Sequence, residues 1–415
     1  MYDLYGSSVS LSSDGTIVAI GATANSGNGR KAGHVRVYAR ANETSSWVKR
    51  GDDIDGEAAW DLSGVSVSLS SDGSIVAIGA EENSDNGNVA GHVRVYAWSD
   101  ESSSWLKRGD DIDGEAAGDK SGVSVSLSSD GNIVAIGASL NGDNGFAAGH
   151  VRVFAWTDES SSWVKRGDDI DGEALYEFSG IKVSLSSDGN IVAIGGYKYA
   201  PNFSSNTGRV RVYGWTDSNS SWVQLGGDID GEAAEGATFI SISLSSDGTI
   251  VAMGVPGNDG NGTDAGHTRV HAWTNGSSWV QLGDDIDGEA AEDNSGFSVS
   301  LSSDGTVVAI GAVKNAGNGT AAGHVRVYVW EDNSSWVLRG NDIDGETSSF
   351  SGSSTSLSSD GSIVAIGAPY TIEGGHVRVF KFNLPGGGGF GGELIQNSEQ
   401  SVNYSFHFSL HDVIS

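Results

Sequence analysis

A unit of about 58 residues is repeated seven times along this chain and fills nearly all of it. Each copy carries, in order, the words SLSSDG, IVAIGA, GHVRVY and SSWVKRGDDIDGEA or close variants of them. The aspartate of SLSSDG falls at Asp14, Asp72, Asp130, Asp188, Asp247, Asp304 and Asp360, with spacings of 58, 58, 58, 59, 57 and 56 residues. One such unit cannot bury its apolar face alone, so the copies must stack on their neighbours.

The second copy indicates how one unit folds. Residues 65–69 alternate apolar side chains with serines, which is the period of a strand, and an Asp-Gly pair follows as a hairpin signal. Residues 75–80 are apolar on both faces, as in a strand that is covered on both sides. Residues 91–98 and 104–108 predict a third and a fourth strand.

Four antiparallel strands joined by short turns describe one blade of a β-propeller. We therefore expect an all-β fold, a seven-bladed β-propeller of four-stranded antiparallel blades, over residues 1–382. An open β-solenoid is the alternative, and the hairpin turns argue against it. The tryptophans that end the third strand and open the fourth are predicted to pack across strands or between blades, with sugar stacking as the alternative.

The charge of the chain limits its partners. The sequence has 54 acidic and 23 basic side chains, a net charge of −31, and no cysteine. A surface this acidic repels phosphate backbones and anionic lipid, so we expect no nucleic acid and no membrane insertion, and cations, basic proteins or neutral glycans as suitable partners. Without cysteine there is no disulfide and no thiol-ligated metal.

Three short words carry a resemblance to a known family. They are SGFSV at 295–299, IGAP at 366–369 and GHVRVF at 375–380. Together they resemble FG-GAP repeats, the units of the seven-bladed propeller at the head of integrin α chains, over about residues 1–382. In wording the chain is more similar to the DIDGEA/SLSSDG repeat proteins of aquatic microbes, whose activity is not known.

Integrin-type blades bind calcium in a D-x-D/N-x-D-G-x-x-D loop between the first two strands, and this chain departs from that loop. The aligned stretch at 68–76 reads SLSSDGSIV, so only the central Asp-Gly remains. Calcium needs six to eight oxygen ligands, several of them from carboxylates. We therefore expect a plain hairpin turn here, and the resemblance does not carry metal binding over to it.

The densest carboxylates lie in the DDIDGE links between units, where the D-x-D-G-E spacing favours a hard cation such as calcium. The structural alternative is the one that we favour, with each aspartate capping backbone amides or pairing with the arginine of the third strand. The candidate calcium ligands are Asp53, Asp55, Glu57, Asp111, Asp113, Glu115, Asp169, Asp171, Glu173, Asp285, Asp287 and Glu289.

A histidine recurs at the start of the third strand, and the fourth unit has Arg209 in its place. Because these histidines belong to separate blades, they are too far apart to chelate one ion, and we interpret them as structural. No Ser-His-Asp arrangement, paired catalytic carboxylate or phosphate loop stands out from the repeats, so no catalytic residue is predicted. The histidines are His34, His92, His150, His267, His324 and His376.

Several N-x-S/T sequons fall mostly in predicted loops, and they agree with a secreted glycoprotein. The candidate N-glycosylation sites are Asn42, Asn202, Asn219, Asn261, Asn275, Asn318, Asn333 and Asn403.

The seventh unit lacks the fourth-strand word, so its last blade is predicted to expose an edge. A Gly-rich linker over 383–401 is followed at 402–415 by an amphipathic strand outside the repeat. This strand either completes its own blade or adds to a neighbouring molecule. Its apolar positions, the candidate assembly residues, are Val402, Tyr404, Phe406, Phe408 and Leu410.

From these features we expect a non-catalytic, extracellular or cell-surface propeller with a structural or adhesive role. It would self-associate through the C-terminal strand into a filament or surface layer, or contact other surface proteins and glycans. A lectin-like glycan-binding module is the alternative, and an enzyme is the third class. No cofactor is expected with certainty, and calcium at the links is the candidate.

Overall fold

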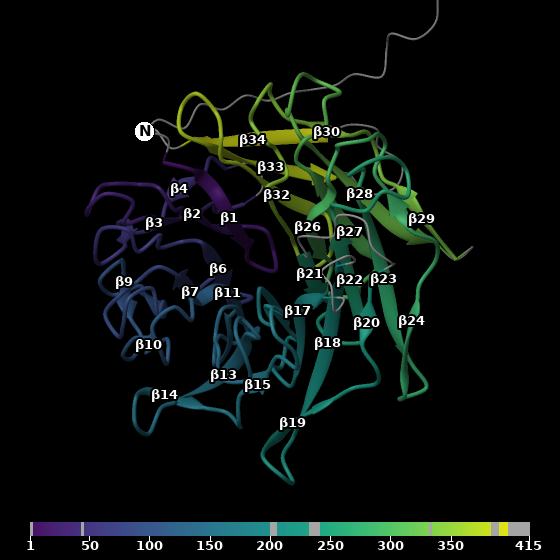
Figure 1. Cartoon of the computed structure of the whole chain (residues 1–415). Coiled ribbons are helices and arrows are strands. Elements are labelled where there is room, and N and C mark those ends of the chain that lie inside the picture. The colour runs from purple at the N-terminus through teal and green to yellow at the C-terminus, as the bar shows by residue number, and fades with distance from the viewer. Residues whose placement is uncertain are drawn as a thin grey trace, which may run out of the picture.

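The chain forms a ring of seven antiparallel sheets in the computed structural model, which describes residues 3–42, 45–199, 206–231, 241–331, 334–382 and 390–396. Figure 1 shows the sheets arranged like blades around a central axis. This confirms the all-β, seven-bladed propeller expected from the repeat. No helix long and apolar enough to cross a membrane occurs in the part of the chain that the structure describes.

The strands follow one another in sequence order, so every blade is one contiguous stretch of chain. Blade 1 contains β1 (Tyr5–Leu11), β2 (Ile17–Ala22), β3 (His34–Ala39), β4 (Val48–Lys49) and β5 (Ile54–Asp55). Blade 2 contains β6 (Ser66–Leu69), β7 (Ile75–Ala80), β8 (His92–Ser99), β9 (Ser104–Lys107) and β10 (Ile112–Asp113). Blade 3 contains β11 (Ser121–Leu127), β12 (Ile133–Ala138), β13 (His150–Thr157), β14 (Ser162–Lys165) and β15 (Ile170–Asp171). Blade 4 contains β16 (Lys182–Leu185), β17 (Ile191–Tyr199), β18 (Asn206–Thr216), β19 (Ser221–Gln224) and β20 (Ile229–Asp230).

The remaining blades repeat this plan, except that the last one ends differently. Blade 5 contains β21 (Ser241–Leu244), β22 (Ile250–Val255), β23 (His267–Thr274), β24 (Ser278–Gln281) and β25 (Ile286–Asp287). Blade 6 contains β26 (Ser295–Leu301), β27 (Val307–Ala312), β28 (His324–Glu331), β29 (Ser335–Leu338) and β30 (Ile343–Asp344). Blade 7 contains β31 (Ser354–Leu357), β32 (Ile363–Ala368), β33 (His376–Phe382) and β34 (Phe390–Gln396).

The apolar core lies between adjacent blades, as the stacking argument requires. Val35 and Val37 of blade 1 share one cluster with Val76 and Ile78 of blade 2, and all four are buried. A corresponding cluster joins blade 7 to blade 1 and includes Tyr5, which is fully buried. The IVAIGA strands are apolar on both faces because a neighbouring blade covers each face.

The outer edge of blades 1 to 6 is divided into two short strands. In blade 2, both β9 and β10 pair with β8, and the register places Trp105 opposite Trp98 and Asp113 opposite His92. The Ile-Asp pair of the DDIDGE word is therefore part of the sheet and not only a link. This pairing positions an acidic side chain beside the histidine that begins the third strand.

The tryptophans fasten blades 2 to 6 to the blades that precede them. The rings of Trp98 and Trp105 meet edge to face with centroids 5.4 Å apart, and Trp105 Nε1 donates a hydrogen bond of 2.8 Å to the carbonyl of Arg50 in blade 1. The same bond recurs at blades 3 to 6. The predicted packing both across strands and between blades therefore occurs.

The SSDG turns build a closed ring of backbone hydrogen bonds. The N–H of Ser71 donates to the carbonyl of Ser129 in the next blade, and seven such bonds of 2.8 Å run around the propeller until Ser359 donates to Ser13. Gly73 has a φ of +65°, and a Cβ there would lie 2.7 Å from the side chain of Ile17 in the preceding blade. The turn is thus both a hairpin and a contact between blades.

The aspartate carboxylate of the turn accepts hydrogen bonds from residues of the same loop. Asp72 accepts hydrogen bonds from the hydroxyl of Ser70 (2.7 Å) and from the N–H and hydroxyl of Ser74 (2.9 and 2.7 Å). The loop between β6 and β7 spans five residues, which is longer than the two-residue hairpin expected from Asp-Gly. This arrangement agrees with a plain turn in place of an integrin-type calcium loop.

The outer position of blade 7 is filled by β34, which pairs with β33 from Phe382↔Phe390 to His376↔Gln396. We expected a linker at 383–401, but residues 390–396 of that range form a strand and complete the blade within the same molecule. The predicted amphipathic strand with Val402, Tyr404, Phe406, Phe408 and Leu410 lies outside the described residues.

Candidate metal centres

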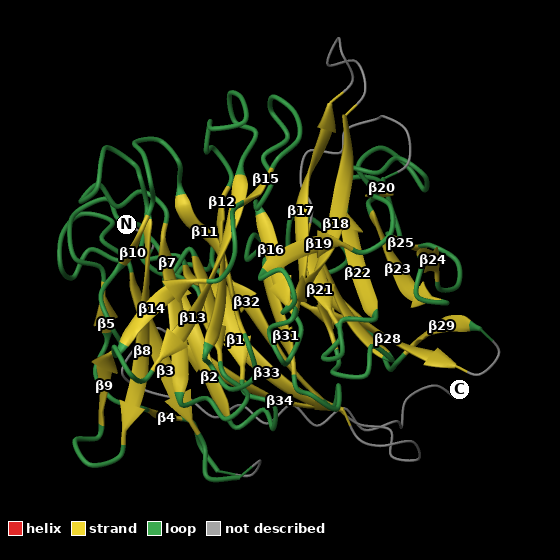
Figure 2. Ribbon diagram, turned by 90° about the horizontal axis from the view of Figure 1, so that it is seen from below, coloured by secondary structure: helices red, strands yellow, loops and turns green. Residues whose placement is uncertain are grey.

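The DDIDGE segments and the loops after the second strands lie together at one end of the ring, where Figure 2 shows the tall loops beside β10 and β15. Asn86 of such a loop donates its side-chain N–H to the carbonyl of Gly114, with a length of 2.8 Å. The bond recurs at Asn28, Asn144, Asn261 and Asn318. This contact brings loop carboxylates close to those of the DDIDGE word.

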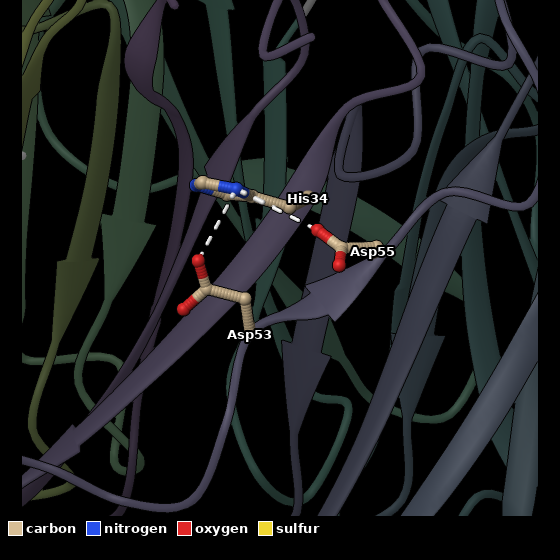
Figure 3. A group of neighbouring side chains, drawn as sticks. All are labelled: His34, Asp53 and Asp55. Carbon is tan, nitrogen blue, oxygen red and sulfur yellow. Dashed lines mark ion pairs between the residues drawn. The ribbon is translucent and has the colours of Figure 1, made fainter. Parts of the chain in front are cut away.

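The three carboxylates of one DDIDGE word do not converge on one point, contrary to the expected calcium triad. Asp55 pairs in register with His34, and His34 Nδ1 lies 3.6 Å from Asp53 and 4.0 Å from Asp55. Figure 3 shows the carboxylates of both aspartates directed toward one ring nitrogen of this imidazole. Glu57, by contrast, reaches blade 2, where Glu57 Oε2 lies 4.0 Å from His92 Nδ1.

Histidine and carboxylate ligand atoms gather within 4.8 Å of one another in five clusters of the described chain. Each cluster is numbered after the blade that carries its histidine, so the five are clusters 1, 2, 3, 5 and 6. In order, they are His34, Asp53 and Asp55; Glu57, Asp85 and His92; Glu115, Asp143 and His150; His267, Asp285 and Asp287; and Glu289, His324 and Asp342.

The imidazoles of clusters 2 and 3 are buried and unsatisfied. His92 is 1% exposed and His150 is 0% exposed, and neither ring nitrogen of either residue has a hydrogen-bond partner within the described part of the chain. Burial, reinforced by the nearby Arg94, lowers the pKa of His92 to about 4, and burial with Arg152 lowers the pKa of His150. Both imidazoles are therefore neutral at pH 7, with a nitrogen lone pair available to a ligand.

Part of the acidic charge is compensated by structural pairing, as the alternative interpretation predicted. Arg94 binds Glu57 Oε1 at 3.4 Å and donates to the carbonyl of Asp55 at 2.7 Å. Lys107 pairs with Asp111 at 2.6 Å, four residues along the chain. Glu57 Oε2 still faces His92, so the pairing leaves one oxygen of this carboxylate toward the cluster.

Other carboxylates remain crowded. Burial and the neighbouring Asp53 raise the pKa of Asp55, and burial together with Asp111 and Asp85 raises the pKa of Asp113. A raised carboxyl pKa means that the ionised form is disfavoured by its surroundings. A cation placed among these groups would relieve that cost.

Among the described residues, blades 4 and 7 show no such cluster, and each shows a different reason. In blade 4, Arg209 replaces the histidine and binds Glu173, Asp228 and Asp230 at 3.6, 3.2 and 3.0 Å. In blade 7, His376 pairs in register with Gln396 of β34, and no carboxylate trio surrounds it among the described residues.

The other candidate residues of the links are placed as follows. Asp169 pairs with Lys165, and Asp171 lies 4.0 Å from His150, whereas Glu173 and Glu289 reach the arginines of the following blades. The sequence did not single out the histidines as ligands, nor Asp85, Asp143 and Asp342. The usable signal was that the histidine and the third aspartate of DDIDGE lie on two strands that pair with each other.

The sequons are only partly accessible. Asn42, Asn219 and Asn275 are exposed, whereas Asn202, Asn333 and Asn403 lie outside the described residues. Asn261 and Asn318 use their side-chain nitrogen to hold the DDIDGE segment, with lengths of 2.7 and 2.8 Å. A glycan on either nitrogen would break that bond, so these two positions suit a structural role.

One blade-specific group lies away from the clusters. Lys120, in the segment that leads into blade 3, lies 3.7 Å from Glu81 and 3.5 Å from Glu82 of blade 2. Burial raises the pKa of Glu81, and Lys120 acts in the opposite direction. These charges neutralise one another, which is a structural arrangement and not that of an activated nucleophile or base.

Comparison with known proteins shows the fold. No protein-family model matches the chain, and no curated protein matches it significantly. A candidate 6-phosphogluconolactonase from Bacteroides uniformis is 12% identical with a TM-score of 0.55, and the periplasmic gluconolactonase of Pseudomonas aeruginosa is 13% identical with a TM-score of 0.53. Each alignment covers 90% of this chain and 93% of the other. A prolyl endopeptidase structure has 14% identity and a TM-score of 0.51, over 94% of this chain and 50% of the other.

This comparison contradicts the expected function. The sequence predicted a non-catalytic structural or adhesive propeller, or a lectin-like module, whereas the similar solved structures are named as lactonases and a peptidase. We therefore withdraw that prediction, and the expectation that the chain is not an enzyme gains no support. At 12–14% identity the similarity shows the fold alone, so those activities belong to the proteins named. The FG-GAP resemblance, the extracellular location and the partners stay predictions.

Proposed function

We propose that this propeller binds divalent metal ions at its histidine–carboxylate clusters, and that clusters 2 and 3 are the principal sites. The observation that carries this proposal is the buried imidazole of His92, which has no hydrogen-bond partner and whose Nδ1 points at Glu57. An unpartnered buried polar group costs about 1–3 kcal/mol. A metal ion bound at this nitrogen would remove that cost.

The ligand chemistry favours a transition-metal ion such as Zn²⁺ over the calcium expected from the carboxylates alone. Neutral imidazole together with carboxylate oxygen is a common zinc donor set, whereas calcium takes six to eight oxygens. Zinc lies about 2.1 Å from such ligands, so two donors around one ion are roughly 3–4 Å apart. The 4.0 Å between His92 Nδ1 and Glu57 Oε2 approaches this separation.

Access and charge also support the proposal. Glu57 and Glu115 are 36% and 37% exposed, and Asp85 and Asp143 are exposed, so an ion can enter from solvent. The net charge of −31 concentrates cations near the surface.

Equilibrium dialysis followed by metal analysis tests the proposal, with Zn²⁺, Mn²⁺ and Ca²⁺ offered separately to the full-length chain. We expect at least two tightly bound Zn²⁺ per chain and weaker binding of Ca²⁺. The double variant His92→Ala, His150→Ala should lose two equivalents of Zn²⁺.

The matched control is His376→Ala, because His376 has the same place in the repeat and no carboxylate trio around it among the described residues. It should retain the parent stoichiometry. Zinc uptake that is absent, or unchanged in the double variant, would refute the proposed function; preferential Ca²⁺ uptake would refute the assignment of the metal.

A further inference from the structure

We infer that the ion in clusters 2 and 3 joins consecutive blades, and that the guanidinium of Arg209 makes the same junction permanently in blade 4. This inference rests on the proposed function and adds a structural role for the same sites.

The ligands of clusters 2 and 3 come from two blades. Glu57 follows β5 at the end of blade 1, whereas Asp85 and His92 belong to the β7–β8 connection and to β8 of blade 2. Glu115 stands in the same relation to Asp143 and His150 of blade 3. An ion held by such a set is therefore bound by both neighbours at once.

Cluster 1 provides an internal contrast. His34, Asp53 and Asp55 all belong to blade 1, so an ion there would be held within one sheet. Asp53 also binds Arg36 at 2.9 Å and pairs with Lys49, which already supply positive charge. Clusters 2 and 3 are thus places where an ion bridges blades, and cluster 6, with Glu289 from blade 5 and His324 from blade 6, has the same arrangement.

Blade 4 has a fixed cation where clusters 2 and 3 have an imidazole. Arg209 stands opposite Asp230 in the register, just as His92 stands opposite Asp113. Its guanidinium contacts Glu173, which follows β15 of blade 3, and also Asp228 and Asp230 of blade 4. One positive group therefore already joins the two blades, in the position that the ion would take in clusters 2 and 3.

A permanent cation requires arginine at position 209, whereas a bound ion requires histidine there. Substitutions at this position therefore test the inference. Arg209→His restores the repeat histidine beside Glu173, Asp228 and Asp230, whereas Arg209→Gln removes the cation without supplying an imidazole. Both variants should unfold at a lower temperature than the parent when metal is absent. Zn²⁺ should bind Arg209→His with one extra equivalent and recover most of its loss in Tm, but should not rescue Arg209→Gln.

Bound zinc raises the Tm of any protein that binds it only when folded, so the decisive quantity is the difference in rescue between the two variants. Equal Tm values for Arg209→His and Arg209→Gln in saturating Zn²⁺ would overturn the inference. That outcome is distinct from failure of the proposed function, in which the parent itself binds no zinc.

A second measurement covers the case in which the residue 209 variants do not fold. The double variant Glu57→Gln, Glu115→Gln removes the ligands contributed by the preceding blades. The parent should gain about 2 °C or more in Tm with saturating Zn²⁺, and the double variant should gain less than half of this. A gain equal to that of the parent would show that the preceding blades contribute nothing.

Discussion

The carboxylate of Asp72 stabilises its turn because three short hydrogen bonds from Ser70 and Ser74 converge on it. Burial raises the pKa of Asp72, but these hydrogen bonds outweigh burial and hold the pKa below its ordinary value. The aspartates of the other six turns are shifted in the same direction. Seven ionised turns therefore contribute to folding at neutral pH.

The turn aspartate should make stability depend on pH in acid. Because the folded pKa is depressed, the stability from the ionised form is present above the unfolded pKa of about 3.9 and is lost as pH falls through the folded pKa. Asp72→Asn should lower Tm by about 1–2 °C at pH 7, and this difference from the parent should shrink below pH 4. Thermal unfolding followed by circular dichroism between pH 7 and 2 measures it. A difference that is constant across this range would contradict the assignment.

The sequence predicted this turn but not how the candidate metal ligands are grouped, for a physical reason. The turn is local, since all its partners lie within five residues of one another. Glu57 and His92 are brought together only by the docking of two blades, and no periodicity within one unit encodes that contact. From the sequence, Glu57 was grouped with Asp53 and Asp55, its neighbours in the chain. In the structure the chain bends after β5, and Glu57 lies beside the next blade.

At the scale of elements, the inner strands were predictable and the outer edge was not. Strands such as β7 can be predicted from their continuous apolar runs, which occur because both faces of the strand are covered. The two-residue strands such as β10 lie inside an acidic word, and β34 follows a glycine-rich stretch, so neither has a strand-like composition. Their pairing is imposed by the free edge of the third strand, which needs partners for its backbone groups.

Strand β34 should contribute measurably to the stability of the ring. Truncation after Phe382 removes the partner of β33 and exposes its edge, whereas truncation after Gln396 keeps the ladder. We expect the shorter protein to unfold at least about 3 °C below the longer one, and to aggregate more readily through the bare edge. Comparing the two truncations isolates β34, and equal Tm values would mean that its pairing does not matter.

At the scale of the molecule, six junctions between blades are continuous in the chain, and the junction of blade 7 with blade 1 is not. At that seam, the N–H of Ser359 donates to the carbonyl of Ser13 as part of the backbone ring, and the N–H of Tyr5 donates to the carbonyl of Gly374. Trp47, however, is 6% exposed and its Nε1 has no partner, whereas the equivalent Trp105 is bonded to the preceding blade. The seam therefore lacks both a chain connection and the tryptophan hydrogen bond that joins blades 2 to 6 to their predecessors.

Hydrogen exchange should reveal this seam. The amide of Ser359 should exchange faster than the amide of Ser303, although both donate 2.8 Å bonds in the same ring. The physical reason is that no chain connection holds the two blades together at the seam, so local opening there is less restrained. Mass spectrometry of peptides spanning 357–363 and 299–305 measures the comparison. Protection that is equal in the two peptides would place the seam on a par with the other junctions.

Each sheet of the described chain is built from one uninterrupted run of residues, with no strand exchanged between the first and the last. The length of the protein can therefore change in whole steps: an event that deletes or duplicates one repeat removes or adds a complete sheet, together with its own segment of the serine ring. A descendant with six or eight sheets would need no new way of joining its ends, only a different angle between neighbours. Because the ring is closed by non-covalent contacts and every sheet is contiguous in the chain, the number of sheets can change by one repeat at a time.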